Sequence, residues 1–176
     1  ATHTFSHPFF WEPEKASQRE GFTAEYGMNM AIPNYPAMNL EREIIGSRDY
    51  IQRELLPADK QVRLIFWSGE ALPSAEAIGM AYAAGMANVN GAETYITRAN
   101  PSLSGLYPLL RPTSGGLQIY APIINENLYT NLWTGPFYGF ERVLDTFELT
   151  DSPRRLRGLN LYYHFYSGTK QASIKA

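Results

Sequence analysis

The chain has 176 residues, of which 44% are hydrophobic, 14% aromatic and 18% charged, which suits one compact domain and excludes wholesale disorder. Fifteen Lys and Arg against seventeen Asp and Glu give a formal net charge of -2, so the bulk charge favours neither nucleic acid nor an anionic membrane as a partner. The sequence has no cysteine, which excludes disulfides, thiolate metal sites and cysteine nucleophiles, so a metal ion would need His, Asp, Glu or backbone oxygen ligands.

No segment of the sequence has the length and character of a membrane span. Residues 77–87 form the longest apolar stretch, well short of the roughly 20 residues that a spanning helix needs. The first residues lack the basic and apolar segments of a signal peptide, and the last ten look like a helix that has only begun. We therefore expect one domain, cut from a longer protein whose other domains are its partners.

The first half of the chain predicts two helices around a buried strand. Apolar residues at helical spacing predict a helix over residues 40–55, with Asn39 as its N-cap and Pro57 as its stop. An almost continuous apolar run over residues 62–67 is typical of a strand covered on both faces, which favours a parallel sheet. A second helix is expected over residues 74–84, closed by Gly85 in the left-handed conformation.

The second half continues the alternation of strands and helices. The pattern predicts short strands over residues 94–97 and 117–120, a helix over 138–147, the strongest strand over 159–166, and the opening of another helix after it. Strands that alternate with helices indicate an α/β architecture. Periodicity leaves open whether the strands form a doubly wound sheet or a (β/α) barrel.

Two of the three histidines, His3 and His7, are separated by three residues, as metal ligands often are. In an extended strand, residues four apart lie about 13 Å from each other, too far to share one ion. One turn of coil would bring the two imidazoles within about 6 Å. The pair is therefore a candidate metal site if the segment coils, and otherwise two surface histidines.

The third histidine, His164, falls near the end of the strongest predicted strand, directly before a predicted helix opening. The carboxyl ends of strands are where α/β sheets and barrels place their functional residues. His164 is therefore a candidate catalytic residue. The alternative is a core histidine that forms a hydrogen bond with a neighbouring group.

Four further residues are candidates for binding a substrate. Glu70 and Arg98 follow predicted strands, and the planar fork of Arg98 could orient a carboxylate. Trp11 and Trp67 offer flat apolar faces of the kind that stack on sugar rings, and we expect Trp11 to be the exposed one. The alternatives are surface or turn-forming roles for the charged pair and core packing for the indoles.

Two motifs resemble those of the NodB-type polysaccharide deacetylases. The run H-T-F-S-H-P over residues 3–8 is similar to the metal-binding motif of that family, and N-L-Y-Y-H-F-Y-S-G over residues 160–168 is similar to its late motif, which carries a catalytic histidine. Residues 66–73 and 120–127 also resemble segments of the deacetylase domain of Pel exopolysaccharide-modifying proteins, so the resemblance extends over most of the chain.

The resemblance implies a fold, a reaction and a location. The fold would be part of a distorted (β/α) barrel, and the reaction the hydrolysis of N-acetyl groups on an amino-sugar exopolysaccharide of a biofilm, in the periplasm or outside the cell. The implied cofactor is one divalent metal, usually zinc, held by two His and one Asp. His3 and His7 would be metal ligands, and His164 would be the general acid that protonates the departing amine.

One part of the family pattern does not appear in the sequence. The family's Asp-Asp motif, which supplies the base and the third ligand, lies upstream of the metal histidines, and only Ala1 and Thr2 precede His3. We therefore expect the chain to be a later portion of a deacetylase domain, inactive by itself. The alternatives are a carbohydrate-binding or scaffold module without chemistry, or an interaction domain in which all three histidines are structural.

Overall fold

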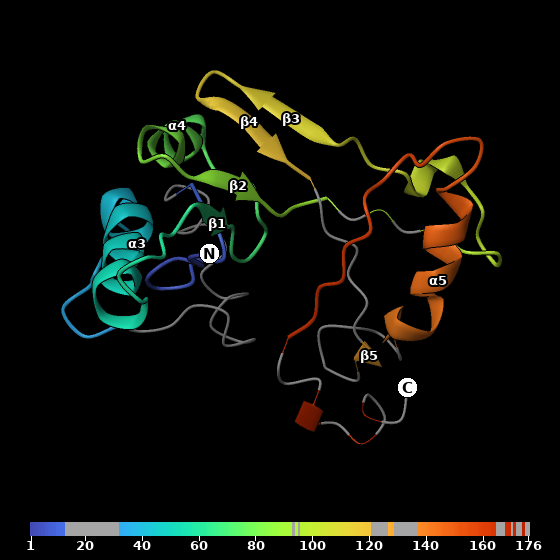
Figure 1. Cartoon of the computed structure of the whole chain (residues 1–176), viewed down its shortest axis with the longest axis horizontal. Helices are drawn as coiled ribbons and strands as arrows, with labels where there is room; N and C mark the ends of the chain where they lie inside the picture. Colours follow the sequence, from blue (N-terminus) through green and yellow to red (C-terminus); the bar gives the residue numbers. More distant parts are fainter. Residues whose placement is uncertain are drawn as a thin grey trace. The chain divides into compact units, whose positions relative to one another are not determined.

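The computed structural model describes residues 1–12, 32–92, 94, 96–120, 127–128, 137–164, 168–169, 171 and 174. The chain divides into two compact units (Figure 1). The first unit comprises Ala1–Gly91 and Leu110–Ile119, and the second comprises Ala92–Leu109 and Tyr120–Ala176. The expectation of a single domain stays a prediction, and the two units are described one after the other.

The first unit contains a four-stranded mixed sheet. Its strands are β1 (Leu64–Phe66), β2 (Ala87–Val89), β3 (Leu110–Thr113) and β4 (Gly116–Ile119), in the spatial order β1-β2-β4-β3 (Figure 1). β2 pairs in parallel with β1 and with β4, whereas β3 and β4 form an antiparallel hairpin. The predicted mixture of helices and parallel strands is confirmed. β1 and β4 lie where strands are expected, and β2 and β3 are additions.

The predicted first helix is confirmed with both of its ends. Residues 40–55 are helical throughout and include η1 (Arg42–Gly46), α3 (Ser47–Tyr50) and η2 (Ile51–Leu55). The side chain of Asn39 caps the helix, because its Oδ1 accepts a hydrogen bond of 2.8 Å from the backbone N–H of Arg42. The helix ends at Leu55, and Leu56 is extended directly before Pro57, as the steric demand of proline requires.

The second predicted helix is also confirmed, as α4 (Ala75–Ala83). Ser74 Oγ accepts a hydrogen bond of 3.1 Å from the N–H of Ala77, and Gly85 takes a left-handed φ of +71° just after the helix. α4 contacts β2, β4 and η1. The approach to the β3–β4 turn requires glycine, since a Cβ added to Gly115 would lie 1.8 Å from the carbonyl oxygen of Ala75.

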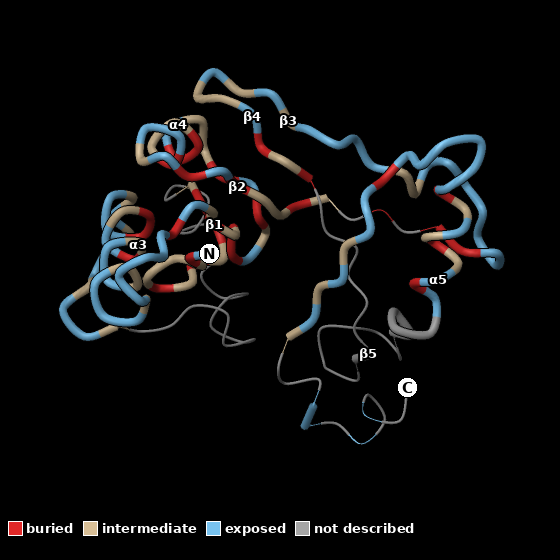
Figure 2. The backbone as a smooth tube through the Cα atoms, in the orientation of Figure 1, coloured by how far each residue is buried: buried red, intermediate tan, exposed pale blue. Residues whose placement is uncertain are grey.

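The core of the first unit lies where the helix over residues 40–55 (the long helix) meets α4 and β1. Buried positions gather there along the chain (Figure 2). The buried cluster consists of Trp11, Ile44, Val62, Ile65, Trp67, Ala71, Ala77, Ile78, Ala81 and Met86. The long helix contributes Ile44 to this cluster, β1 contributes Ile65, and α4 contributes Ala77, Ile78 and Ala81. Neither the helices nor the strand are therefore expected to be stable without the others.

The second unit contains the helix α5 (Gly139–Leu149), the turn η3 (Leu103–Gly105) and a pair of short antiparallel strands, β5 (Asn127–Leu128) and β6 (Phe137–Tyr138). α5 confirms the helix expected over residues 138–147. At the end of the chain, Gly168 and Thr169 lie in a tight turn, and Gln171 and Ile174 are helical. Within the described part of the molecule, no helix has both the length and the apolar character needed to cross a bilayer.

Two predicted strands are wrong for the residues that the structure describes. Over residues 94–97, Thr97 instead exchanges two backbone hydrogen bonds with Asn100, which closes a tight turn. Residues 159–164 form no strand beyond a single bridge residue, Tyr162, and residues 165–166 lie outside the description. Exposed and half-buried residues alternate over 159–164 as in a strand, but pairing depends on a distant partner that the pattern does not reveal.

Ile65 tests the importance of this core. Ile65→Ala removes a fully buried side chain from the centre of β1 and should lower the free energy of unfolding by about 2–5 kcal/mol. The control is Leu55→Ala, because that side chain is 64% exposed and its truncation should change stability by less than about 0.5 kcal/mol. Urea denaturation followed by tryptophan fluorescence measures both. Equal losses for the two variants would contradict the assignment of the core.

Candidate functional site

The candidate site begins at the carboxyl edge of the parallel strands. Thr2 pairs with β1 in parallel, because its N–H donates to the carbonyl of Leu64 (2.8 Å) and its carbonyl accepts from the N–H of Phe66 (2.9 Å). The chain therefore leaves the sheet at His3, beside the carboxyl end of β1. In open α/β sheets this edge is where ligands bind.

Residues 3–7 coil, as a shared metal ion would require. Thr4 and His7 have left-handed backbones, with φ of 82° and 54°. Such a conformation is uncommon outside glycine and is an outlier for a β-branched residue such as threonine. The coil brings the ring centroids of His3 and His7 to 4.9 Å, with the ring planes at 74°. The predicted condition for a shared site is met.

A backbone carbonyl orients the first imidazole. His3 Nδ1 lies 2.6 Å from the carbonyl oxygen of Phe66, the last residue of β1. A carbonyl oxygen can only accept, so Nδ1 carries the proton, and in the neutral ring Nε2 then carries the lone pair that can bind a metal. Histidines that ligate metals almost always bond their second nitrogen in this way, which fixes the tautomer and the direction of the ring.

The donors of this pair fit zinc in kind, although not in number. Neutral imidazole nitrogens are common zinc ligands, and zinc sites use three or four protein ligands. Within the described residues, no group of three or more His, Asp or Glu side chains could hold an ion. Between the two histidines, Thr4 Oγ1 is buried without a hydrogen-bond partner among the described residues, as polar atoms at functional sites sometimes are.

The apex of the turn is bound to a buried carboxylate of the long helix. The backbone N–H groups of Phe5 and Ser6 donate to Glu43 Oε2 at 2.9 and 2.8 Å. Glu43 Oε1 accepts from the hydroxyl of Ser6 and, at 2.8 Å, from the hydroxyl of Tyr35. Glu43 is fully buried, so these four donors replace its water. Sequence reasoning missed Glu43, although its spacing from Leu40 puts a charged residue on the apolar side of the helix.

Aromatic and cationic groups close over the same apex. The guanidinium carbon of Arg42 lies 4.2 Å from the ring centroid of Phe5 and 5.2 Å from that of Tyr35, within the range of cation–π attraction. The pKa of Tyr35 is raised to about 12, chiefly by burial and further by Glu43, while the hydrogen bond from the backbone of Asn39 partly opposes the increase. The hydroxyl of Tyr35 therefore keeps its proton at neutral pH and can remain a donor to the carboxylate.

The loop after β1 packs directly against the segment that follows His7. Ser68 Oγ donates to the carbonyl of Pro8 (2.7 Å), and the N–H of Glu70 donates to the carbonyl of Phe9 (2.9 Å). Gly69, with a φ of +60°, permits this approach, since a Cβ there would lie 2.3 Å from the backbone of Phe9. The predicted residue Glu70 and the histidine pair thus belong to two loops that contact each other at one edge of the sheet.

The two candidate stacking tryptophans form core contacts. The ring centroids of Trp11 and Trp67 lie 4.8 Å apart in an edge-to-face arrangement, and neither residue is exposed. Each indole N–H is bonded internally, Trp11 to the carbonyl of Ser68 and Trp67 to the side chain of Asn88, both at 3.0 Å. The expectation that Trp11 is exposed is wrong. Because both N–H groups find partners inside, the indoles are buried at little polar cost.

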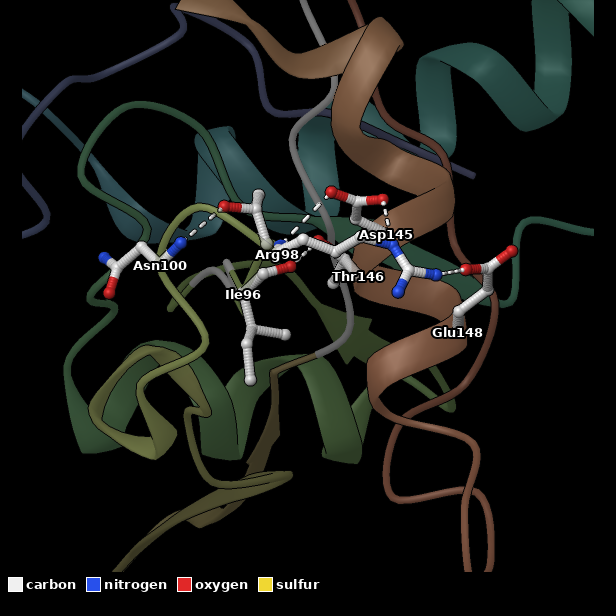
Figure 3. A network of polar contacts seen from close by, with 7 residues as sticks. Ile96, Arg98, Asn100, Asp145, Thr146 and Glu148 are labelled. Carbon is white, nitrogen blue, oxygen red and sulfur yellow. Dashed lines mark hydrogen bonds and ion pairs between the residues drawn. The ribbon is translucent and has the colours of Figure 1, made fainter.

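Arg98 belongs to the second unit, where its fork binds carboxylates of the same chain (Figure 3). Its Nε lies 3.3 Å from Asp145 Oδ1, its guanidinium pairs with Glu148, and its backbone N–H donates to Asp145 Oδ2 at 3.2 Å. Beside it, Thr146 Oγ1 donates to the carbonyl of Ile96 at 2.7 Å. These contacts attach the turn after residue 96 to α5, which is a structural role. Binding of a substrate by Arg98 stays a prediction.

His164 also belongs to the second unit, and it is half-buried. Its Nε2 lies 2.9 Å from the hydroxyl of Tyr162, with ring centroids 5.1 Å apart. Residues two apart lie on the same side of an extended chain, which explains the contact. The convergence of His164 with the histidine pair stays a prediction.

No protein-family model, curated protein or solved structure matches the chain. The chemical argument therefore rests on the residues themselves. What the structure brings together is the pair His3 and His7, the carbonyl of Phe66 and the carboxylate of Glu43, at the carboxyl edge of a mixed sheet.

The contact between the two loops can be tested at Gly69. Gly69→Ala forces a side chain into a left-handed residue and into the backbone of Phe9, so it should destabilise the fold by more than about 1 kcal/mol. The matched control is Gly46→Ala, which places a Cβ at ordinary contact distance inside a helix and should stabilise by about 0.5–1 kcal/mol. Opposite shifts of the urea midpoint are expected. Shifts of the same sign would contradict the close approach.

Proposed function

We propose that the chain is part of a metal-dependent polysaccharide deacetylase that hydrolyses N-acetyl groups on an amino-sugar exopolysaccharide, in the periplasm or outside the cell. The observation that carries the proposal is the His3–His7 pair, with ring centroids 4.9 Å apart and His3 Nδ1 bonded to a strand-end carbonyl. The resemblance of residues 3–8 and 160–168 to the NodB-type motifs supplies the reaction. The mixed sheet with its helices would be part of a distorted (β/α) barrel.

Each histidine has a distinct chemical task in this proposal. His3 and His7 would hold a divalent metal, best zinc, through neutral nitrogens. A bound zinc ion supplies an acidified water and a polarised acetamide carbonyl. His164, as the imidazolium, would donate its proton to the sugar nitrogen, so that the carbon–nitrogen bond breaks with its electron pair on a neutral amine. The resemblance implies an upstream Asp pair as the base and the third ligand.

The product of this reaction has a different charge from the substrate. An N-acetyl group is neutral, whereas the amine that remains on the sugar is protonated at neutral pH. The polymer therefore becomes more cationic and binds anionic partners more strongly. This change in the charge of the polymer is the physical consequence that the proposed reaction would have in the periplasm or outside the cell.

Zinc binding by the 176-residue chain is the first test. Two imidazoles leave a zinc ion short of ligands, so calorimetric titration should show binding weaker than micromolar and an assay of acetate release should show no turnover. His7→Ala should abolish even the weak binding, while Glu54→Ala, at a charged site on the surface of the long helix, should leave it unchanged. Identical titrations of the native chain and His7→Ala would remove the metal site and favour a carbohydrate-binding module.

The role of His164 has to be tested in a longer protein that contains both this chain and the implied upstream Asp pair. In such a protein, His164→Ala should retain the bound metal and lower kcat by about 10²–10⁴-fold, the usual contribution of a general acid. His3→Ala should lose both metal and activity. Metal analysis alongside steady-state kinetics separates the two roles. Loss of metal from His164→Ala, or unchanged kcat, would contradict the assignment.

A further inference from the structure

The carboxylate of Glu43 has no task in the reaction, yet it is fully buried beside the histidine pair. Removing an ionised carboxylate from water is costly unless hydrogen bonds replace its hydration. Here the replacement comes from the backbone of Phe5 and Ser6 and from the hydroxyls of Ser6 and Tyr35. Three of these four bonds come from the turn that carries the two histidines, so the carboxylate and the turn determine each other's positions.

The strain in the turn shows why such a support is needed. Thr4 and His7 flank Phe5 and Ser6, and both have a left-handed backbone that their side chains disfavour. A conformation of this kind persists only where the surroundings hold it. Phe66 holds the His3 end of the turn, through the bond to Nδ1, and Glu43 holds the apex.

We propose that Glu43 is a positioning residue for the histidine pair: by accepting the N–H groups of Phe5 and Ser6, it keeps the turn closed and the imidazoles of His3 and His7 face to edge. The inference rests on the proposed function for the use of the pair, but the geometry that it assigns to Glu43 can be measured without any metal. Tyr35 strengthens the arrangement, because its hydroxyl donates to the same carboxylate.

The native chain and three variants test the proposal. Glu43→Ala removes the acceptor, and Glu43→Gln keeps one oxygen for the backbone N–H groups and turns its amide toward the two hydroxyls. Glu41→Ala is the matched control, because it removes an exposed carboxylate two residues away on the same helix. The chain has three histidines, so His7→Ala and His164→Ala suffice to assign the imidazole signals.

The readouts are the nuclear Overhauser effect between the rings of His3 and His7 and the nitrogen shifts that report the tautomer of His3. Both are recorded at about pH 8, above the ordinary imidazole pKa of about 6.5. We expect the ring contact and the Nδ1–H tautomer in the native chain, in Glu41→Ala and in Glu43→Gln, and their loss in Glu43→Ala. Persistence of both signals in a folded Glu43→Ala, or equal loss in Glu41→Ala, would overturn the proposal.

If Glu43→Ala does not fold, a fourth variant, Glu43→Asp, tests the proposal instead. Glu43→Asp keeps the charge but withdraws it by one carbon–carbon bond, about 1.5 Å, which is too far for the bonds to the turn. The ring contact should then weaken and the His3 shifts should move; unchanged signals would count against Glu43 as the support.

A zinc titration of the same samples separates the two proposals. Glu43→Ala should bind zinc about 10–100-fold more weakly than Glu41→Ala, the effect expected of a group that orients a metal ligand. If zinc leaves the His3 and His7 signals of the native chain unchanged, the proposed metal site fails, and the ring contact alone then decides whether Glu43 positions the pair.

Discussion

The backbone pairing of Thr2 with β1 determines where the candidate site can form. Two hydrogen bonds fix the segment in register with Leu64 and Phe66, and the hydroxyl of Thr2 lies 2.6 Å from that of Ser47 on the long helix. His3 then continues the ladder with its ring nitrogen in place of a backbone N–H. A shift of this pairing by one residue would direct the imidazole to the other face of the sheet.

The site is assembled from segments that are distant in the sequence. The turn of residues 3–7, the long helix and the loop after β1 meet at one edge of the sheet, joined by bonds from Glu43, Phe66 and Ser68. The turn supplies hydrogen bonds that offset the desolvation of the buried Glu43 carboxylate, and the same bonds hold the turn in its strained backbone conformation. Such mutual dependence is expected to make the edge form cooperatively with the core.

Local signals predicted the parts of the fold that local physics determines. The helices over residues 40–55 and 74–84 were predictable with their caps, because Asn39 and Ser74 act on backbone groups within three residues of themselves. The strand expected over residues 159–166 is wrong in its described part, because pairing depends on a partner elsewhere in the chain. β3 was missed, since Pro112 argues against a strand and is tolerated here on an edge.

The same distinction applies to the site. The spacing of His3 and His7 predicted that the segment must coil, but it did not reveal Glu43, which contacts the turn across 37 residues of sequence. The exposure of Trp11 was predicted wrongly because its partners are also distant in the chain, with Ser68 lying 57 residues away and Trp67 beside it. Composition and spacing indicate which residues are chemically capable, whereas their surroundings follow from long-range packing.

The turn that carries the two imidazoles is attached at two points, through Phe66 at the end of β1 and through Glu43 of the long helix. The spacing of the imidazoles therefore depends on the distance between strand and helix, which is set by the buried cluster that includes Ile44 and Ile65. Any change in the core that slides one support past the other alters the spacing of the nitrogens. In this architecture, the spacing of the two imidazoles at the edge of the sheet depends on the volume of side chains in the core.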